Sequence, residues 1–185
     1  MRIPRVIEDI IMPEEVEEVF EKFGVFYSED QKLKLQNSLP GKETLQKASN
    51  HVLVPEPPEL TDERLSEKNP FSSCLPKIKK DVSGWSLIQK SPVEGSTFLR
   101  WDQQIRLLGT KEYVPTTVEM AWLISLYYEI KSVLLFSDVH VRTAKSKTNQ
   151  KYSGAVISGY KGFNIEKWSE EQKASCIGLS AALSF

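Results

Sequence analysis

Alternating apolar and polar residues predict that the C-terminal part of the chain is rich in strands. Residues 139–143 alternate with the period of a half-buried strand, and residues 155–158 resume a strand pattern. Between them lies the run 145–151, which has no apolar side chain and predicts a solvated turn. Residues 177–183 are small and apolar, as expected of a buried closing strand. The polar stretch before this strand indicates either a displayed recognition surface or an ordinary solvated loop.

Helical patterns dominate the chain before residue 80. Pro13 suits the first turn of a helix whose glutamates lie at the positive end of the helix dipole. Ser28 and Gln31 have the spacing of a capping box for a second short helix. Residues 52–54 predict a short strand, and residues 62–68 predict a further helix. We expect the N-terminal helices to pack as a supporting layer.

The most apolar helix is predicted directly after Pro115. Thr116 is the expected N-cap, and Glu119 completes a capping box. Apolar side chains then surround most of the helix, which is typical of a core helix lying against a sheet. These residues are Met120, Ala121, Leu123, Ile124, Tyr127 and Tyr128. A strand at residues 85–90 and helical spacing over residues 98–108 are predicted upstream.

The composition is that of a soluble globular protein, with 40% hydrophobic and 26% charged residues among 185. This length fits one domain, or one domain with an elaborated N-terminal part. The net charge of −1 gives no reason to expect nucleic acid as a partner. No apolar run approaches the ~20 residues of a membrane helix, so we expect no membrane insertion. Because the first residues lead into an acidic segment, we expect no signal peptide and a protein that is cytoplasmic when made.

Residues that commonly carry catalysis or bind metals are sparse. His140 has no second histidine two or four residues away, so we interpret it as a structural histidine. Cys74 and Cys176 are expected to be buried thiols, with one disulfide between them as the alternative. The adjacent Glu170 and Glu171 lack the further acidic residues that a calcium site needs. We therefore predict no metal site, no cofactor and no enzymatic activity.

Three groups of short motifs resemble one protein family. They are Gly84-Trp85-Ser86-Leu87 with Pro92-Val93-Glu94-Gly95-Ser96, then Trp101-Asp102-Gln103-Gln104 with Val114-Pro115-Thr116, then the chain from Val139-His140-Val141-Arg142-Thr143 onward. Together they are similar to the variable proteins that retroelements diversify in bacteria, archaea and their viruses. The resemblance covers about residues 85–183.

This resemblance implies an α+β protein with a C-type lectin-like fold, made of short antiparallel strands and one core helix. Residues 1–80 would form an N-terminal support region, and residues 81–185 the C-type lectin-like domain with a variable display segment. In such systems a reverse transcriptase misreads adenines in a template, which rewrites codons near the 3′ end of the target gene. The implied partner is a protein or a cell-surface molecule, and association with a virus particle is compatible with this family.

The resemblance also implies which residues contact the ligand. They are Tyr160, Phe163, Asn164, Glu166, Lys167, Trp168, Ser169, Gln172, Ala174 and Ser175, of which Trp168 matches a tryptophan of the family pattern. We expect these side chains to lie together on one exposed surface, with Gly178-Leu179-Ser180 as the closing strand. The chain departs from the pattern at Lys173, where relatives carry arginine, and at Ala182 and Leu183, where they carry basic residues.

Two other functions fit the same sequence. One is an enzyme of the formylglycine-generating type on a related fold, which would need Cys74 and Cys176 close together in a pocket. The other is a structural or adaptor protein of a virus particle, in which the acidic N-terminal helices dock a partner.

Overall fold

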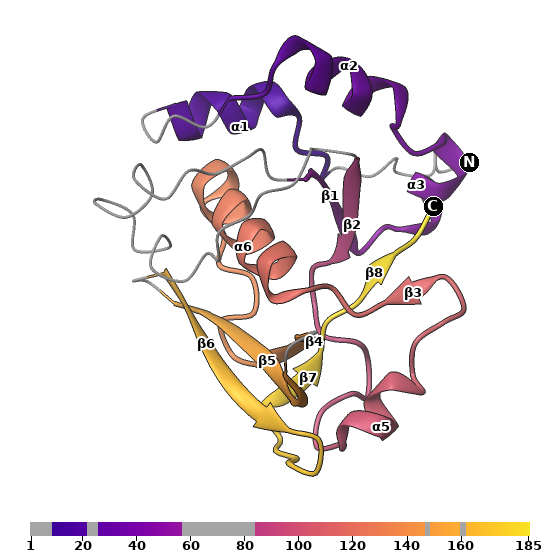
Figure 1. The fold of residues 1–185 in the computed structure, drawn as a ribbon, viewed down its shortest axis with the longest axis vertical. Helices are drawn as coiled ribbons and strands as arrows, with labels where there is room; N and C mark the ends of the chain where they lie inside the picture. Colours follow the sequence, from indigo (N-terminus) through magenta and orange to yellow (C-terminus); the bar gives the residue numbers. More distant parts are fainter. Residues whose placement is uncertain (1–8, 22–25, 57–83, 147–148, 160–161) are drawn as a thin grey trace, which may run out of the picture.

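Two four-stranded sheets and one long buried helix form the fold of the described residues (Figure 1). The computed structural model describes residues 9–21, 26–56, 84–146, 149–159 and 162–185. Its mixture of helices and mainly antiparallel strands agrees with the predicted α+β class.

The first sheet brings together strands from distant parts of the chain. Its order is β1 (His51–Pro55), β2 (Trp85–Gln89), β8 (Ala182–Leu183) and β3 (Glu112–Tyr113), and all neighbours are antiparallel. All of β1 and most of β2 are buried. Strands covered on both faces have nearly continuous apolar runs, which is why both could be predicted from sequence.

The second sheet has the order β6 (Gly162–Ser169), β5 (Asn149–Gly159), β4 (His140–Ser146) and β7 (Ile177–Leu179). The first three strands form an antiparallel meander, and β7 lies parallel to β4. Figure 1 shows α6 (Thr117–Lys131) between this sheet and the N-terminal helix α1 (Pro13–Phe20).

Helix α6 is the centre of the hydrophobic core. Eight consecutive side chains, from Met120 to Tyr127, are buried. The ring of Trp122 lies 5.6 Å from that of Phe20 in α1, and its indole N–H donates to the Pro55 carbonyl at 2.9 Å. The predicted capping box is present, since the Glu119 amide donates to Thr116 Oγ1 at 3.2 Å. The prediction of a core helix is confirmed.

The N-terminal helices form a layer over this core. Helix α2 (Glu29–Asn37) begins with the predicted capping box, in which the Ser28 amide donates to Gln31 Oε1 at 2.8 Å. Helix α3 (Lys42–Lys47) was not predicted, because its short polar sequence has no apolar stripe. The indole N–H of Trp85 donates to the Leu35 carbonyl at 2.8 Å, which ties α2 to the first sheet.

Several sequence predictions about the strands need correction. Pairing continues into the run 145–151 as far as Ser146 and Asn149, so most of it is strand instead of turn. Strand β6 was missed, and the single closing strand is in fact β7 and β8, which belong to different sheets. The helical spacing over residues 98–108 gives only the short helix α5 (Trp101–Ile105). Pairing with neighbouring strands outweighs local sequence preference in each strand case.

The described parts of residues 1–80 and 81–185 share one core and one sheet. Strand β1 pairs with β2 along its whole length, and α1 packs against α6. The predicted boundary at residue 80, the helix at 62–68 and Cys74 lie outside the described residues. Among the helices described, none is long and apolar enough to cross a membrane. The β1–β2 pairing and the α1–α6 contact show that the acidic N-terminal region packs on the rest of the protein.

Truncation of Leu123 or Ile124 to alanine should lower the free energy of unfolding by about 2–5 kcal/mol. Both side chains are fully buried in α6, so each change leaves a cavity. Denaturant unfolding followed by circular dichroism measures the loss. Leu33→Ala is the control, because Leu33 is 57% exposed and should change stability by less than about 0.5 kcal/mol. Losses below about 1 kcal/mol at both core positions would contradict this assignment.

The buried His51 should make the fold less stable in mild acid. Burial lowers the pKa of His51 from its usual 6.5, an effect that Lys90 strengthens and Glu112 opposes. Neither ring nitrogen has a hydrogen-bond partner among the described residues. Below about pH 6.5 the unfolded chain therefore binds more protons than the folded one, and stability falls as the pH falls.

This effect can be isolated with His51→Leu. Unfolding free energies of the protein and the variant should be compared between about pH 5 and 8. The difference between the two should grow in favour of the variant as the pH falls below about 6.5. Parallel pH profiles would show that His51 does not contribute.

Candidate ligand-binding surface

One face of the second sheet points away from the hydrophobic core. Strand register places Arg142, Ala155 and Glu166 side by side on this face. Their strand neighbours Val141 and Ile165 belong to the core or pack against it. Because successive side chains of a strand point to opposite faces, the first three residues lie on the face opposite α6. We call it the outer face.

Four residues form what we call the outer-face cluster: His140, Asn164, Glu166 and Trp168. The indole N–H of Trp168 donates to Glu166 Oε2 at 3.0 Å, and the Asn164 amide donates to Glu166 Oε1 at 3.4 Å. The His140 Nε2 atom lies 3.6 Å from Glu166 Oε2. The rings of His140 and Trp168 have their centroids 6.3 Å apart and are tilted by 46°. The Glu166 carboxylate is therefore held at the centre of the cluster.

The cluster combines buried and accessible groups. The side chain of Glu166 is 43% exposed, whereas that of His140 is 17% exposed and its Nδ1 atom is buried without a hydrogen-bond partner among the described residues. Ala155, next to Glu166 on this face, is fully buried. A methyl group there leaves room for the longer side chains on either side to cover it. The Glu166 carboxylate is therefore accessible to solvent, while Ala155 beside it is covered.

Arg142 is fully buried and supports the turn that follows β6. Its Nη2 donates to the Ser169 carbonyl at 3.1 Å and to the Gln172 carbonyl, and its Nη1 donates to Gln104 Oε1 at 3.3 Å. Burial lowers the pKa of the guanidinium, which nevertheless stays charged in proteins. Gln104 in turn donates to the Ser96 carbonyl at 2.7 Å. One buried cation thus joins β4, α5 and the turn at residues 169–172.

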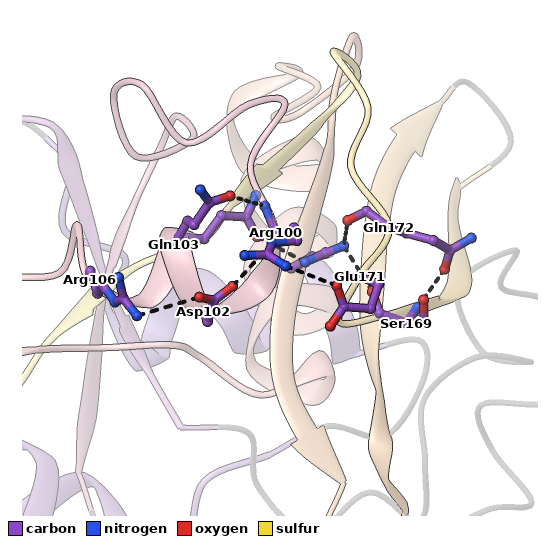
Figure 2. A network of polar contacts seen from close by, with 9 residues as sticks. Arg100, Asp102, Gln103, Arg106, Ser169, Glu171 and Gln172 are labelled. Carbon is purple, nitrogen blue, oxygen red and sulfur yellow. Dashed lines mark hydrogen bonds and ion pairs between the residues drawn. The ribbon is translucent and has the colours of Figure 1, made fainter.

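The turn is also fixed from its solvent side. Figure 2 shows Glu171 directed toward Arg100, whose Nη1 atom lies 3.2 Å from the carboxylate. Arg100 also approaches Asp102, which contacts Arg106, so alternating charges run from the turn along α5. These groups are well exposed, so each pair contributes little stability alone. They orient the turn more than they stabilise the fold.

The exposed aromatic side chain of Phe98 lies beside residues 173–174. Phe98 is 58% exposed, and its backbone has a φ of 59°, in the left-handed region that a bulky residue rarely adopts. Its amide donates to the Ala174 carbonyl at 3.0 Å, and the Lys173 ammonium lies 5.0 Å from its ring centroid. Residues 98–101 therefore extend the surface formed by residues 169–175.

The residues predicted as ligand contacts do not all share one face. Asn164, Glu166 and Trp168 lie together on the outer face, but the alternation of β6 directs Lys167 and Ser169 to the opposite side. The expectation of a single surface is wrong for those two residues. None of these five is buried.

The remaining predicted contacts fall into two groups. Gln172 ends the turn, and Ala174 and Ser175 follow it. Gln172 and Ser175 are exposed, and Ala174 is partly buried. Tyr160 lies outside the described residues. Phe163 is placed only as a residue of β6 paired with Ser158.

Three residues of this region were not predicted as part of the site: His140, Arg142 and Phe98. His140 was interpreted as structural, yet it contacts the cluster through Glu166 and Trp168. The alternation over residues 139–143 already places His140 and Arg142 on one face, which is the signal that could have found both. Nothing in the sequence indicates the backbone conformation of Phe98.

The cysteine prediction is wrong where it can be checked. Cys176 is exposed and free, while Cys74 lies outside the described residues. Within the described part of the chain, no group of three or more His, Cys, Asp or Glu side chains could hold a metal ion.

Comparison of the chain with family models, with curated proteins and with solved structures gives no match in any of the three.

Replacing Arg142 by methionine should lower the free energy of unfolding by about 2–4 kcal/mol, because buried carbonyls lose a charged donor. Backbone amides in residues 169–176 should also exchange hydrogen faster in the variant than in the unchanged protein, whereas those of α6 serve as an internal reference. Arg142→Lys should give a similar local effect, since an ammonium cannot reproduce the planar fork of donors. Hydrogen exchange with mass spectrometry measures both.

The control is Arg106→Met, because Arg106 directly follows α5 and has a side chain that is 78% exposed. It should change neither stability nor exchange. Unchanged exchange in residues 169–176 of Arg142→Met would show that the turn does not depend on Arg142.

Proposed function

We propose that this chain is a non-enzymatic ligand-binding protein with a C-type lectin-like fold, diversified by a retroelement at its C-terminal display surface. One observation carries the proposal. The fully buried Arg142 holds the backbone of the turn at residues 169–172, while side chains in residues 164–175 stay accessible. A fixed backbone with exchangeable side chains is what a diversified binding protein requires.

The energetics of the surface support this role. Exposed side chains such as Asn164, Gln172 and Ser175 can be exchanged at a stability cost of about 0.5 kcal/mol or less. A single aromatic or charged anchor can change binding by about 2 kcal/mol or more. Stability and specificity can therefore vary separately on this scaffold.

The type of side chain supports a protein or cell-surface partner. Trp168 is a partly exposed aromatic residue and Phe98 an exposed one. Arg100 contacts Glu171 in the turn at residues 169–172. Tryptophan and arginine dominate the energetics of protein interfaces, and aromatic residues are enriched there. No described contact specifically favours the formylglycine-generating alternative, which depends on pairing Cys74 with Cys176.

Sequencing the DNA that adjoins the gene tests the proposal. We expect a reverse-transcriptase gene and an imperfect copy of the 3′ coding segment, which differs from the gene at adenines of the copy. The differences should fall in codons for accessible residues such as Asn164, Gln172 and Ser175. Codons for the buried Ile177 and Leu179 serve as internal controls and should be spared.

Two results would overturn the proposal. One is the absence of both the reverse-transcriptase gene and the second copy from the adjoining DNA. The other is a copy whose differences fall equally on the buried and accessible positions.

A further inference from the structure

We propose that the chain forms a dimer with a second copy of itself, in which the free edges of the two β6 strands pair antiparallel around Ile165. The second sheets of the two copies would then join into one, across a two-fold axis that runs perpendicular to them. This inference goes beyond the proposed function and does not rest on it.

Strand β6 is an edge strand, with β5 on one side and no strand on the other in the described part of the chain (Figure 1). Its pairing with β5 continues to Ser169 without a shift in register. The Ser169 amide donates to Gln172 Oε1 at 2.6 Å, and its carbonyl accepts from the Gln172 amide at 3.3 Å. Ser169 therefore directs both groups away from β5, and every second residue of an antiparallel strand does the same. The backbone N–H and C=O groups of Phe163, Ile165 and Lys167 accordingly point to the free side.

The other sheet edges are covered or short. Beside β1, the Ile11 amide donates to the Leu53 carbonyl at 2.9 Å. Beside β7, the Val93 amide donates to the Leu179 carbonyl at 2.9 Å. Strand β3 has only 2 residues. The outward backbone groups of β6 at residues 163, 165 and 167 have no hydrogen-bond partner among the described residues, and an open edge of this kind is a template for another strand.

The described chain after β6 leaves this edge accessible. The Trp101 amide donates to the Glu170 carbonyl at 3.1 Å, and the Phe98 amide donates to the Ala174 carbonyl at 3.0 Å. Both contacts hold the chain toward α5, which packs against β7 at the opposite edge of the sheet. The segment that follows β6 therefore runs back across the sheet and not along its free side.

Two copies of β6 fit best in one register. A two-fold axis perpendicular to the sheet places one residue of β6 opposite itself. With Ile165 at the axis, the outward groups of residues 163, 165 and 167 all find partners, in about six hydrogen bonds. Glu166 then lies opposite Asn164 of the second copy, whose side-chain amide can donate to it. Centring on Glu166 or Lys167 would place like charges directly opposite and make fewer bonds, because the groups of Ser169 are already used.

This symmetry has a consequence for the outer face. An axis perpendicular to the sheet leaves the outer faces of both copies on the same side of the joined sheet. A target that carries repeated binding sites would therefore meet both copies at once and bind with avidity.

Sedimentation equilibrium of the full chain tests the dimer. The mass should rise from 21.1 kDa toward twice this value between about 1 and 300 µM protein, with a Kd on the order of tens of micromolar, as suits a small interface. A reducing agent is kept present, because Cys176 is exposed and free. A single species of 21.1 kDa throughout this range overturns the inference.

Lys167→Pro tests the edge itself. Proline removes an outward N–H and none that β5 uses, so the midpoint of thermal unfolding should change little. Lys167→Ala is the matched control, because it removes the same exposed side chain and keeps the N–H. The proline variant should weaken association about tenfold or more, whereas the alanine variant should stay within about twofold of the unchanged protein. Equal association of the two variants overturns the inference.

Exchange of Asn164 tests the register without altering the backbone. Asn164→Glu places a carboxylate opposite Glu166 of the second copy, twice in each dimer, and should weaken association about threefold or more. Asn164→Lys places a cation there and should strengthen association by about the same factor. Responses of the same sign, or no response, overturn the pairing around Ile165. A dimer that responds to neither Lys167→Pro nor these variants forms through another surface, which equally overturns the inference.

Discussion

The positive charge of Arg142 lies where water does not reach it, and protein oxygens alone must satisfy it. Taking a cation out of water costs several kcal/mol unless hydrogen bonds replace its hydration. Here carbonyl groups of the 169–172 turn and the amide oxygen of Gln104 accept from the two terminal nitrogens, while Nε has no hydrogen-bond partner among the described residues. No carboxylate shares the charge within those residues. The turn and α5 are therefore held in one arrangement, because moving either would leave a buried charge with fewer acceptors. This constraint gives the polar turn at residues 169–172 one defined backbone conformation.

The rest of the molecule supplies a rigid base for that arrangement. Trp122 and Trp85 each bury an indole and donate its N–H to a backbone carbonyl of the N-terminal region. These two bonds join parts of the chain that are far apart in sequence, so α2 is fixed to the first sheet and the first sheet is fixed to α6. The surface formed by residues 169–175 therefore rests on a base whose stability comes from other parts of the chain.

Sequence patterns predicted the elements whose signals are local. The helices begin at capping boxes that can be read from residue types three positions apart, as for Thr116 and Glu119, and α6 has apolar residues around most of its surface. Strand β6 and the separation of β7 from β8 depend on pairing with distant strands, which no local pattern contains. The site divides in the same way. Glu166 and Trp168 were implied by the family resemblance, whereas His140 comes from another strand and is brought to them only by the register of the sheet.

The position of β8 between β2 and β3 has a consequence for how the protein is made. The first sheet cannot close until residues 182–183 have left the ribosome, which occurs only after residues 162–175 have been synthesised. A change of reading frame within that segment would remove both β7 and β8, and with them a strand from each sheet. Such a chain would expose the apolar strands of the first sheet and be removed by cellular proteases. Completion of both sheets therefore requires the correct reading frame through residues 177–183.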